Sequence, residues 1–403
     1  MALRNHYNYL KSVAAVFLLF LVCAGLFNYL IDPYAVFDSA RIAGISDLKP
    51  SAGSRVRMAK PYQVRNYRPK GIIAGNSRPE LGLDPDHSCW PEFSHPVFNL
   101  GLPGAGVGMQ AQTLKHALYE SDVKLILWGI DFADFLAIKS DKPKSVLFNK
   151  SPKKTENKFI VNADGSHNTA YQYKKIEDYL SVIFSLDTAF DSFKTLLQQG
   201  DHNASTRQRN GFNPAKDYNS IILTEGQYVL FSQKNIEIDE RFSKPRLTVF
   251  PYQSKQSNDF SSVSDFLDYA KNRDIKVRLF INPYHADYLS AIYRHNLWPE
   301  FEAWKIRLLE ITDLHQIELW DFSGLSDYNT EITPKRGDKS TTLKWFWEPA
   351  HYKKEIGDKM LNTLLGQWCQ YEPSSEIGTK LSSGNIQRYL ENERRKIQHW
   401  LNN

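Results

Sequence analysis

The pattern of apolar and polar positions divides the chain into an N-terminal apolar segment and a long mixed remainder. From Val13 to Leu30 the residues carry no charge, and only Asn28 and Tyr29 interrupt the apolar run. This length approaches the ~20 residues that a membrane-spanning helix needs. The run is long for the apolar part of a signal peptide, and no small-x-small cleavage pattern lies directly behind it. We expect residues 12–30 to be a retained transmembrane anchor, with a cleaved signal peptide as the alternative.

After this run, the pattern first becomes mixed and polar and then alternates between two periods. Residues 31–69 contain prolines, glycine and scattered charges, which is typical of a stalk. Apolar or β-branched runs then predict strands at 70–74, 97–100, 124–129, 276–281 and 317–321. Helical spacing predicts helices at 109–119, 263–271, 300–314 and 353–365. Such alternation indicates an α/β domain over residues 70–370, with a parallel sheet covered by helices on both faces.

Two stretches depart from this alternation. Residues 132–260 are too long for a loop without structure of its own, so we expect an insertion that forms a lid or a substrate wall. It contains a long helical pattern over 173–199 and polar segments beyond it. Residues 371–403 begin as a linker and end in an amphipathic helical pattern over 385–401.

Charge and composition limit the partners and suggest a topology. The net charge of +5 is small for 403 residues, and the basic residues are spread along the chain, so we expect no nucleic-acid partner. Arg4 and Lys11 precede the apolar run, whereas Asp32 and Asp38 follow it. The positive-inside tendency therefore predicts a cytosolic N-terminus, residues 1–11, in a single-pass cell-membrane protein. The bulk of the chain is expected outside the cytosol, in the periplasm if the envelope is Gram-negative.

Two cysteines, Cys89 and Cys369, lie outside the apolar run. An oxidising compartment permits them to form a disulfide. Spacing in the sequence does not show whether their Cα atoms come within bonding range, so two free buried thiols remain the alternative.

Candidate chemistry comes from two short segments nearly at opposite ends of the domain. Ser77 follows the first predicted strand in the sequence Gly-Asn-Ser, and Glu348 and His351 lie just before the last predicted helix. A serine hydroxyl becomes a nucleophile when an imidazole accepts its proton and a carboxylate orients that imidazole. Both segments are expected above the carboxyl ends of the strands, where sites of parallel sheets lie. Separately, the serine could cap a helix and the Glu/His pair could be a surface hydrogen bond.

These segments resemble motifs of the SGNH (GDSL-like) hydrolase-fold family. The resemblance is to membrane-anchored members linked to bacterial exopolysaccharide or cell-wall acylation, and it covers roughly residues 70–366 without the insertion. Residues 75–78 resemble the block that ends in the catalytic serine, and residues 99–101 resemble the glycine block. Residues 129–131 resemble the Gly-x-Asn block, and residues 348–351 resemble the Asp-x-x-His block. The resemblance implies a three-layer SGNH-like sheet with Ser77, His351 and Glu348 as catalytic residues.

An oxyanion hole is implied by the same resemblance. We expect the backbone N–H groups of Ser77 and Gly101 to line it, with Asn99 as a further donor. Asp131 stands where the family has asparagine, so a neutral donor is replaced by a group that is normally an anion. Losing one such donor typically costs about 3 kcal/mol of transition-state stabilisation. Glutamate in place of aspartate at Glu348 is a smaller change, because glutamate orients histidine in triads on other folds.

Residues at the end of the fourth predicted strand are candidates for substrate binding. Asn282, Tyr284 and His285 lie there, and His285 is a second candidate base; Trp347 precedes the Glu/His pair and could stack on a sugar. Aromatic residues at this spacing also occur in cores. The histidines show no HExxH arrangement and no Cys/His cluster, so no metal site is expected. A glycine cluster at 101–108 does not follow the first strand and contains Pro103, so we expect no dinucleotide and no other cofactor.

Together these observations predict an extracytoplasmic acyl-ester hydrolase or O-acyltransferase that acts on a cell-surface glycan. A transferase would need a membrane-embedded partner protein that delivers the acyl group, since acyl-CoA is not expected outside the cytosol. The alternative is a catalytically inactive SGNH-fold protein that binds glycan or acts as a scaffold in polysaccharide biosynthesis. A plain esterase for small esters, with the insertion as a lid, is a further alternative.

Overall fold

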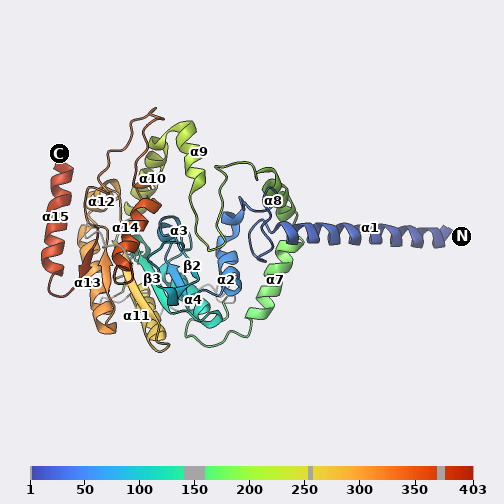
Figure 1. The fold of residues 1–403 in the computed structure, drawn as a ribbon, viewed down its shortest axis with the longest axis horizontal. Helices are drawn as coiled ribbons and strands as arrows, with labels where there is room; N and C mark the ends of the chain where they lie inside the picture. Colours follow the sequence, from blue (N-terminus) through green and yellow to red (C-terminus); the bar gives the residue numbers. More distant parts are fainter. Residues whose placement is uncertain (1, 140–158, 253–256, 370–376, 403) are drawn as a thin grey trace.

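A six-stranded sheet forms the centre of the protein in the computed structural model, which describes residues 2–139, 159–252, 257–369 and 377–402 (Figure 1). Its strand order is β10-β7-β6-β3-β1-β2. The strands are β1 (Gly71–Ala74), β2 (Val97–Asn99), β3 (Leu125–Ile130), β6 (Lys276–Ile281), β7 (Leu319–Asp321) and β10 (Thr379–Leu381). All pairings are parallel except that of β10 with β7. The five predicted strands are present, and the mixed α/β class is confirmed.

Alternate residues of the strands point into two separate cores. Ile72 of β1 joins a core with Leu114 of α4 (Val107–Glu120) and Phe266 of α11 (Asn258–Lys271). Its neighbour Ile73 joins the other core, with Met360 of α14 (Lys354–Leu364). Because successive side chains in a strand point to opposite faces, apolar runs such as Gly-Ile-Ile-Ala suit a sheet covered on both sides.

The remaining helices complete the two layers and the N-terminal part. They are α1 (Ala2–Ile31), α2 (Val56–Tyr67), α3 (Ser77–Gly82), α7 (Tyr171–Ile183), α8 (Leu186–Leu197), α9 (Lys216–Glu225), α10 (Gln227–Phe242), α12 (Ala286–Arg294), α13 (Trp298–His315) and α15 (Ile386–Asn402). Short 3-10 turns lie at Ala52–Arg55, Glu92–Ser94 and Phe132–Asp134. All four helices predicted between the strands are present.

The segment predicted as a stalk is instead part of the folded body. Residues 56–67 form α2, which packs against α4. Lys60 of α2 is fully buried, and its Nζ lies 2.9 Å from Glu80 Oε1 and donates to the Gly101 carbonyl at 2.6 Å. Arg207 also pairs with Glu80, at 3.0 Å. The prediction of a stalk is therefore wrong for this segment, because a three-residue ion cluster holds it inside the protein.

Lys60→Met is therefore expected to lower stability by about 3 kcal/mol or more, because it removes one partner of a buried ion pair and leaves Glu80 less compensated. The measurement is the thermal unfolding midpoint of the full chain in detergent. Lys124→Met is the matched control, since Lys124 pairs with Asp122 on the surface and exposed pairs contribute little. Equal midpoints for the two variants would contradict this assignment.

The insertion at 132–260 leaves and re-enters the domain at one place. Two short strands, β4 (Ala137–Ile138) and β5 (Leu247–Thr248), pair antiparallel at its base. The long helical pattern over 173–199 is two helices, α7 and α8, because Ser185 caps a new helix by accepting from the N–H of Thr188. Residues 140–158 of the insertion lie outside the described residues.

The C-terminal part contributes more than the predicted linker. Residues 371–376 of that linker lie outside the described residues, but residues 379–381 form the edge strand β10. The predicted terminal helix is present as α15, which packs against α12. Glu393 of α15 is buried and accepts the backbone N–H of Leu325.

The N-terminal helix α1 projects away from the body (Figure 1). Among the described residues it is the one helix that is long and apolar enough to cross a membrane, over His6–Ile31. Its apolar side chains are largely exposed.

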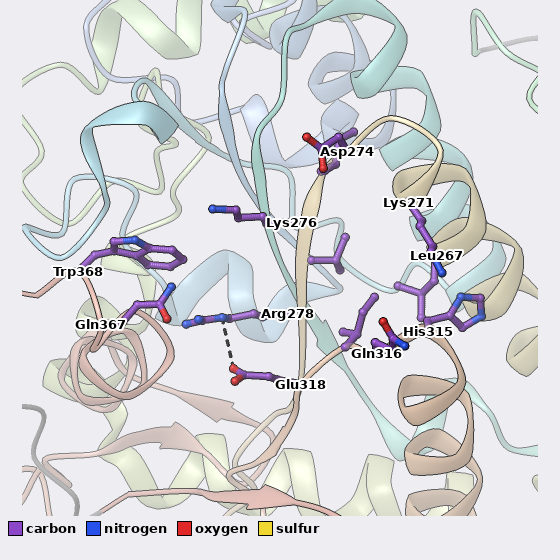
Figure 2. A pocket seen from close by; sticks show the side chains of 13 residues that line it. Leu267, Lys271, Asp274, Lys276, Arg278, His315, Gln316, Glu318, Gln367 and Trp368 are labelled. Atoms are coloured by element: carbon purple, nitrogen blue, oxygen red, sulfur yellow. Dashed lines mark ion pairs between the residues drawn. The ribbon is translucent and has the colours of Figure 1, made fainter.

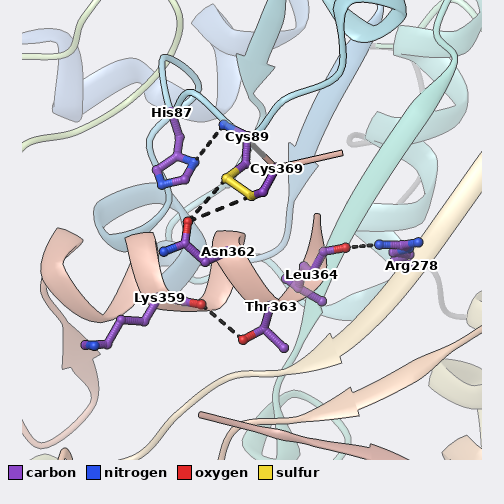
Figure 3. The surroundings of a disulfide bond; sticks show 8 residues. All are labelled: His87, Cys89, Arg278, Lys359, Asn362, Thr363, Leu364 and Cys369. Carbon is purple, nitrogen blue, oxygen red and sulfur yellow. Dashed lines mark hydrogen bonds between the residues drawn. A yellow bond between two sulfur atoms is a disulfide. The ribbon is translucent and has the colours of Figure 1, made fainter. Parts of the chain in front are cut away.

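A disulfide joins Cys89 to Cys369, with Cα atoms 4.5 Å apart (Figure 3). It links the segment after α3 to the segment that follows α14, and the two cysteines are 280 residues apart in sequence. The alternative of two free buried thiols is therefore not what the structure shows.

Candidate active site

Ser77 lies at the carboxyl end of β1, as the first residue of α3. The turn before it requires Gly75, whose φ of +140° and closeness to the Gly129 carbonyl leave no room for a side chain. Asn76 caps α3 by accepting the N–H of Arg78 at 3.0 Å. In the first turn of a helix the backbone N–H groups have no partner within the helix, so the N–H of Ser77 belongs to a positive helix end.

His351 is brought to Ser77 by a hairpin and a close helix contact. Strands β8 (Phe346–Glu348) and β9 (His351–Tyr352) pair antiparallel just before α14. α14 packs against α3 so closely that a Cβ on Gly357 would overlap the carbonyl oxygen of Gly82. The absence of a side chain at Gly357 therefore permits the approach that joins the two ends of the domain.

Ser77, His351 and Glu348 form a continuous chain of hydrogen bonds. Ser77 Oγ lies 2.7 Å from His351 Nε2, and His351 Nδ1 is hydrogen-bonded to Glu348 Oε1. Glu348 is buried, and its other oxygen accepts the N–H of Ala350 at 2.6 Å. Burial acts to raise the pKa of Glu348, but the neighbouring His351 and the Ala350 N–H outweigh it and lower that pKa. An ionised Glu348 holds the proton on Nδ1 and leaves Nε2 to accept from Ser77.

Asp131 is not directed at the serine as a replacement for asparagine. Its Oδ1 lies 2.6 Å from a guanidinium nitrogen of Arg78 and accepts from the Tyr284 hydroxyl at 2.9 Å. Its Oδ2 accepts from the side-chain amides of Asn76 and Asn282. The same Arg78 donates to the carbonyl of Ala350, next to His351, at 2.6 Å. Asp131 therefore anchors an arginine that ties the serine turn to the histidine hairpin.

Two predicted oxyanion donors are engaged elsewhere. The side-chain amide of Asn99 donates to the carbonyls of Pro79 and Leu83, at 2.8 and 2.9 Å. Its oxygen accepts the backbone N–H of Gly101 at 3.0 Å. The structure corrects this part of the prediction, because both groups stabilise the loop after β2 and α3 instead of facing a substrate. Of the predicted donors, the Ser77 N–H lies in the first turn of α3, where backbone N–H groups have no partner within the helix.

The residues predicted to bind substrate are mainly structural. Asn282 and Tyr284 are fully buried, and both contact Asp131. Both ring nitrogens of His285 are occupied, by the carbonyl of Glu331 at 2.9 Å and by the N–H of Asp287 at 3.2 Å. Burial lowers the pKa of His285. Trp347 stacks on Tyr218 of α9, with ring centroids 5.5 Å apart. His285 is therefore an N-cap of α12 and not a second base.

A cavity of about 220 Å³ opens over Ser77 and His351. Sequence reasoning missed most of its walls. These are Asn76, Arg78, Gly104, Asp134, Lys234, Glu237, Ile238, Arg241, Phe242, Tyr288 and Ala350. Burial, together with the charge of Asp131, raises the pKa of Asp134. Five of these residues lie on α10, so the insertion provides one wall of the cavity. In the sequence, Asn76 and Arg78 belonged to the serine block, and Asp134 was signalled only by its position just after β3.

A larger cavity, about 370 Å³, lies at the amino end of the central strand β6 (Figure 2). Lys276 and Arg278 at the start of β6 line it, together with Trp368, and Arg278 pairs with Glu318 at 3.4 Å. Because β1 and β6 are parallel, the amino end of β6 is remote from Ser77. Within the described residues, no group of three or more His, Cys, Asp or Glu side chains is placed to hold a metal ion.

Comparison with known proteins adds no assignment: no protein-family model matches this chain, and no curated protein matches it.

Proposed function

We propose that this protein is a membrane-anchored serine acyl-ester hydrolase or O-acyltransferase of the SGNH type that acts on a cell-surface glycan outside the cytosol. The observation that carries the proposal is the hydrogen-bonded chain from Glu348 through His351 to Ser77. Three side chains from both ends of the domain meet in the order and at the atoms that nucleophilic acyl transfer requires.

The geometry supports a two-step reaction. Ser77 Oγ attacks the acyl carbonyl carbon while its proton moves to His351 Nε2, and Glu348 stabilises the imidazolium that forms. The Ser77 N–H, at the positive end of α3, stabilises the oxyanion. The bond to the leaving alcohol oxygen then breaks, and His351 donates its proton to that oxygen. Water, or a glycan hydroxyl in a transferase, repeats the sequence on the acyl-serine and releases the acid or the new ester.

The cavity walls support a short acyl group on a hydroxyl-rich substrate. Asp134, Lys234, Glu237 and Arg241 place charged groups in the lining beside apolar surface from Ile238 and Phe242, and a cavity of about 220 Å³ has little room for a long apolar chain. Hydroxyl groups of a sugar can both donate to carboxylates and accept from cationic groups. A transferase version requires an acyl donor delivered by a membrane-embedded partner protein.

The topology is part of the proposal. The basic residues Arg4 and Lys11 before the apolar segment support a cytosolic N-terminus. The Cys89–Cys369 disulfide supports an oxidising compartment for the domain. Asn28 of α1 is buried and donates to the carbonyl of Ile183 at 2.9 Å, which supports a retained anchor because cleavage would remove this contact.

An inactive glycan-binding or scaffold protein is a second candidate, because the Asn99 and Gly101 donors are engaged within the protein. A fluorophosphonate probe separates the two candidates, since it reacts only with a serine that is activated as a nucleophile. We expect the probe to modify Ser77 of the full chain in detergent, as identified by peptide mass spectrometry, and His351→Ala to lose the modification. His202→Ala, an exposed histidine in a turn, is the matched control. An unmodified Ser77 in the wild type would support the scaffold.

A further inference from the structure

Helix α8 has the reverse of the usual arrangement of a surface helix. Leu186, Phe190, Phe193 and Leu197, spaced four, three and four residues apart, are 76%, 73%, 59% and 86% exposed. The opposite side, with Thr188, Ser192 and Thr195, is buried against the protein. Helices on the surface of globular proteins place their apolar stripe toward the core. Within the described residues, the protein therefore leaves the apolar side of α8 largely uncovered.

Helix α7 and the connection to α8 extend this apolar face. Tyr173, Ile176 and Leu180 of α7 are exposed at helical spacing, and Phe184 between the helices is also exposed. Together, eight large apolar side chains of α7, α8 and the turn between them, called here the α7–α8 pair, face outward: Tyr173, Ile176, Leu180, Phe184, Leu186, Phe190, Phe193 and Leu197. Contiguous exposed apolar surface of this kind marks a site of protein or membrane contact.

The α7–α8 pair contacts α1 within the apolar run of that helix. The side-chain amide of Asn28 donates to the carbonyls of Ile183 and Ser185, at 2.9 and 3.2 Å, and its oxygen accepts from Ser192 at 3.1 Å. The rings of Phe27 and Phe193 lie 4.8 Å apart. Figure 1 shows α7 and α8 on either side of the point where α1 leaves the body.

The position of these contacts along α1 shows how deep the α7–α8 pair would lie in a membrane that α1 crosses. Phe27 and Asn28 precede the end of the apolar run at Leu30 by two to three residues, and Gly25, which contacts Ile183, precedes it by five. At 1.5 Å per residue, these contacts lie about 3–8 Å inside the run. Amphipathic helices at a membrane surface bury their apolar face about 5–10 Å into the boundary of the acyl chains. The two depths agree.

Hydrogen bonds join the polar side of the α7–α8 pair to the folded body. Asp191 of α8 accepts from the hydroxyls of Tyr34 and Ser51, at 2.7 and 2.8 Å. Asp178 of α7 accepts from the Tyr62 hydroxyl at 2.9 Å. The α7–α8 pair is thus bound both to α1 and to the segment 31–67, so its apolar face keeps a set orientation relative to α1.

We infer that the α7–α8 pair is a second membrane-binding element, immersed in the outer leaflet beside α1, with lipid as its occupant. Lipid follows from continuity, because the exposed face adjoins a helix whose own apolar surface requires the bilayer. The α7–α8 pair holds the domain at a set height and tilt, whereas a single helix with a free stalk would let it swing. The inference rests on α1 crossing the membrane and is independent of the catalytic proposal.

The experiment is a site-directed spin-label measurement on the full chain in vesicles of phosphatidylethanolamine and phosphatidylglycerol. Labels are attached at Phe190→Cys and Leu197→Cys in a Cys23→Ala chain, and their collisions with oxygen and with a water-soluble nickel complex are compared. Oxygen concentrates in the acyl chains and the nickel complex in water. We expect both labels to collide more with oxygen than with nickel.

The controls separate the possible failures. Leu223 on α9 and Leu314 on α13 are similarly exposed apolar residues away from the α7–α8 pair. Labels at Leu223→Cys and Leu314→Cys are expected to collide mainly with the nickel complex. The native Cys23, exposed on α1, reports whether α1 itself is in the bilayer. A Cys23 label in lipid with nickel-accessible labels at 190 and 197 would overturn the inference and leave the face for a protein partner. A Cys23 label that collides mainly with the nickel complex would show that α1 does not cross the bilayer, and the inference would fall with it.

Discussion

Ser77→Ala is expected to lower kcat/KM for p-nitrophenyl acetate by about 10⁴- to 10⁶-fold, because no other group can replace the attacking oxygen. His351→Ala is expected to cause a loss of similar size, since Ser77 Oγ then has no acceptor for its proton. Glu348→Gln keeps the shape but favours the wrong imidazole tautomer, and a loss of about 10⁴-fold is expected. The measurement is initial-rate kinetics of the full chain in detergent.

The double variant Ser77→Ala/His351→Ala gives the sharper test. Residues that act as one unit show strongly non-additive losses, so the double variant is expected to retain the same residual rate as either single variant. Ser220→Ala, an exposed serine on α9, serves as the matched control and is expected to keep the wild-type rate. Additive losses would mean that Ser77 and His351 act separately, and unchanged rates in the single variants would contradict the catalytic proposal.

Asp131→Asn, which introduces the residue that the SGNH family has in this block, is expected to destabilise the protein by about 3–5 kcal/mol. The reason is that Arg78 is buried and forms an ion pair with Asp131 at 2.6 Å. With asparagine at this position the guanidinium remains buried without a counter-charge. The measurement is denaturant-induced unfolding of the full chain in detergent, followed by tryptophan fluorescence.

A double-mutant cycle with Arg78→Met isolates the pair. The variant Arg78→Met/Asp131→Asn is expected to lose less stability than the sum of the single losses, since neither charge is then left alone. Asp38→Asn is the matched control, because its partner Arg209 is mostly exposed and a surface pair contributes little. A stable and more active Asp131→Asn protein would show instead that position 131 acts as an oxyanion donor.

Several features followed from local sequence because local physics determines them. The apolar run of α1, the apolar runs of the five strands and the helical spacing between them are properties of neighbouring residues. The positions of Ser77 after β1 and of His351 before α14 also followed, because parallel strands end at a common edge. This common edge predicted that the two segments lie on the same side of the sheet, but not that their side chains meet.

Other features escaped sequence reasoning because they depend on partners distant in the chain. The segment around Lys60 was predicted as a stalk, but α2 and α3 place Glu80 beside this lysine and bury the pair. Asn99 looked like an oxyanion donor, but the carbonyls of Pro79 and Leu83 take its amide protons. The wall that α10 forms over the cavity had no motif, since polar and apolar residues in a helix do not tell which site the helix covers.

The sequence by itself determined the layered α/β class, the apolar N-terminal segment and the residue types of a nucleophile, base and carboxylate. These depend on periodicity, length and chemical identity, which are local. Only the tertiary structure decided that His351 reaches Ser77, that Asp131 is held by Arg78, and that the apolar face of α8 points outward next to α1. An amphipathic pattern shows that a helix has two faces, but the contacts of its polar face decide which one meets the surroundings.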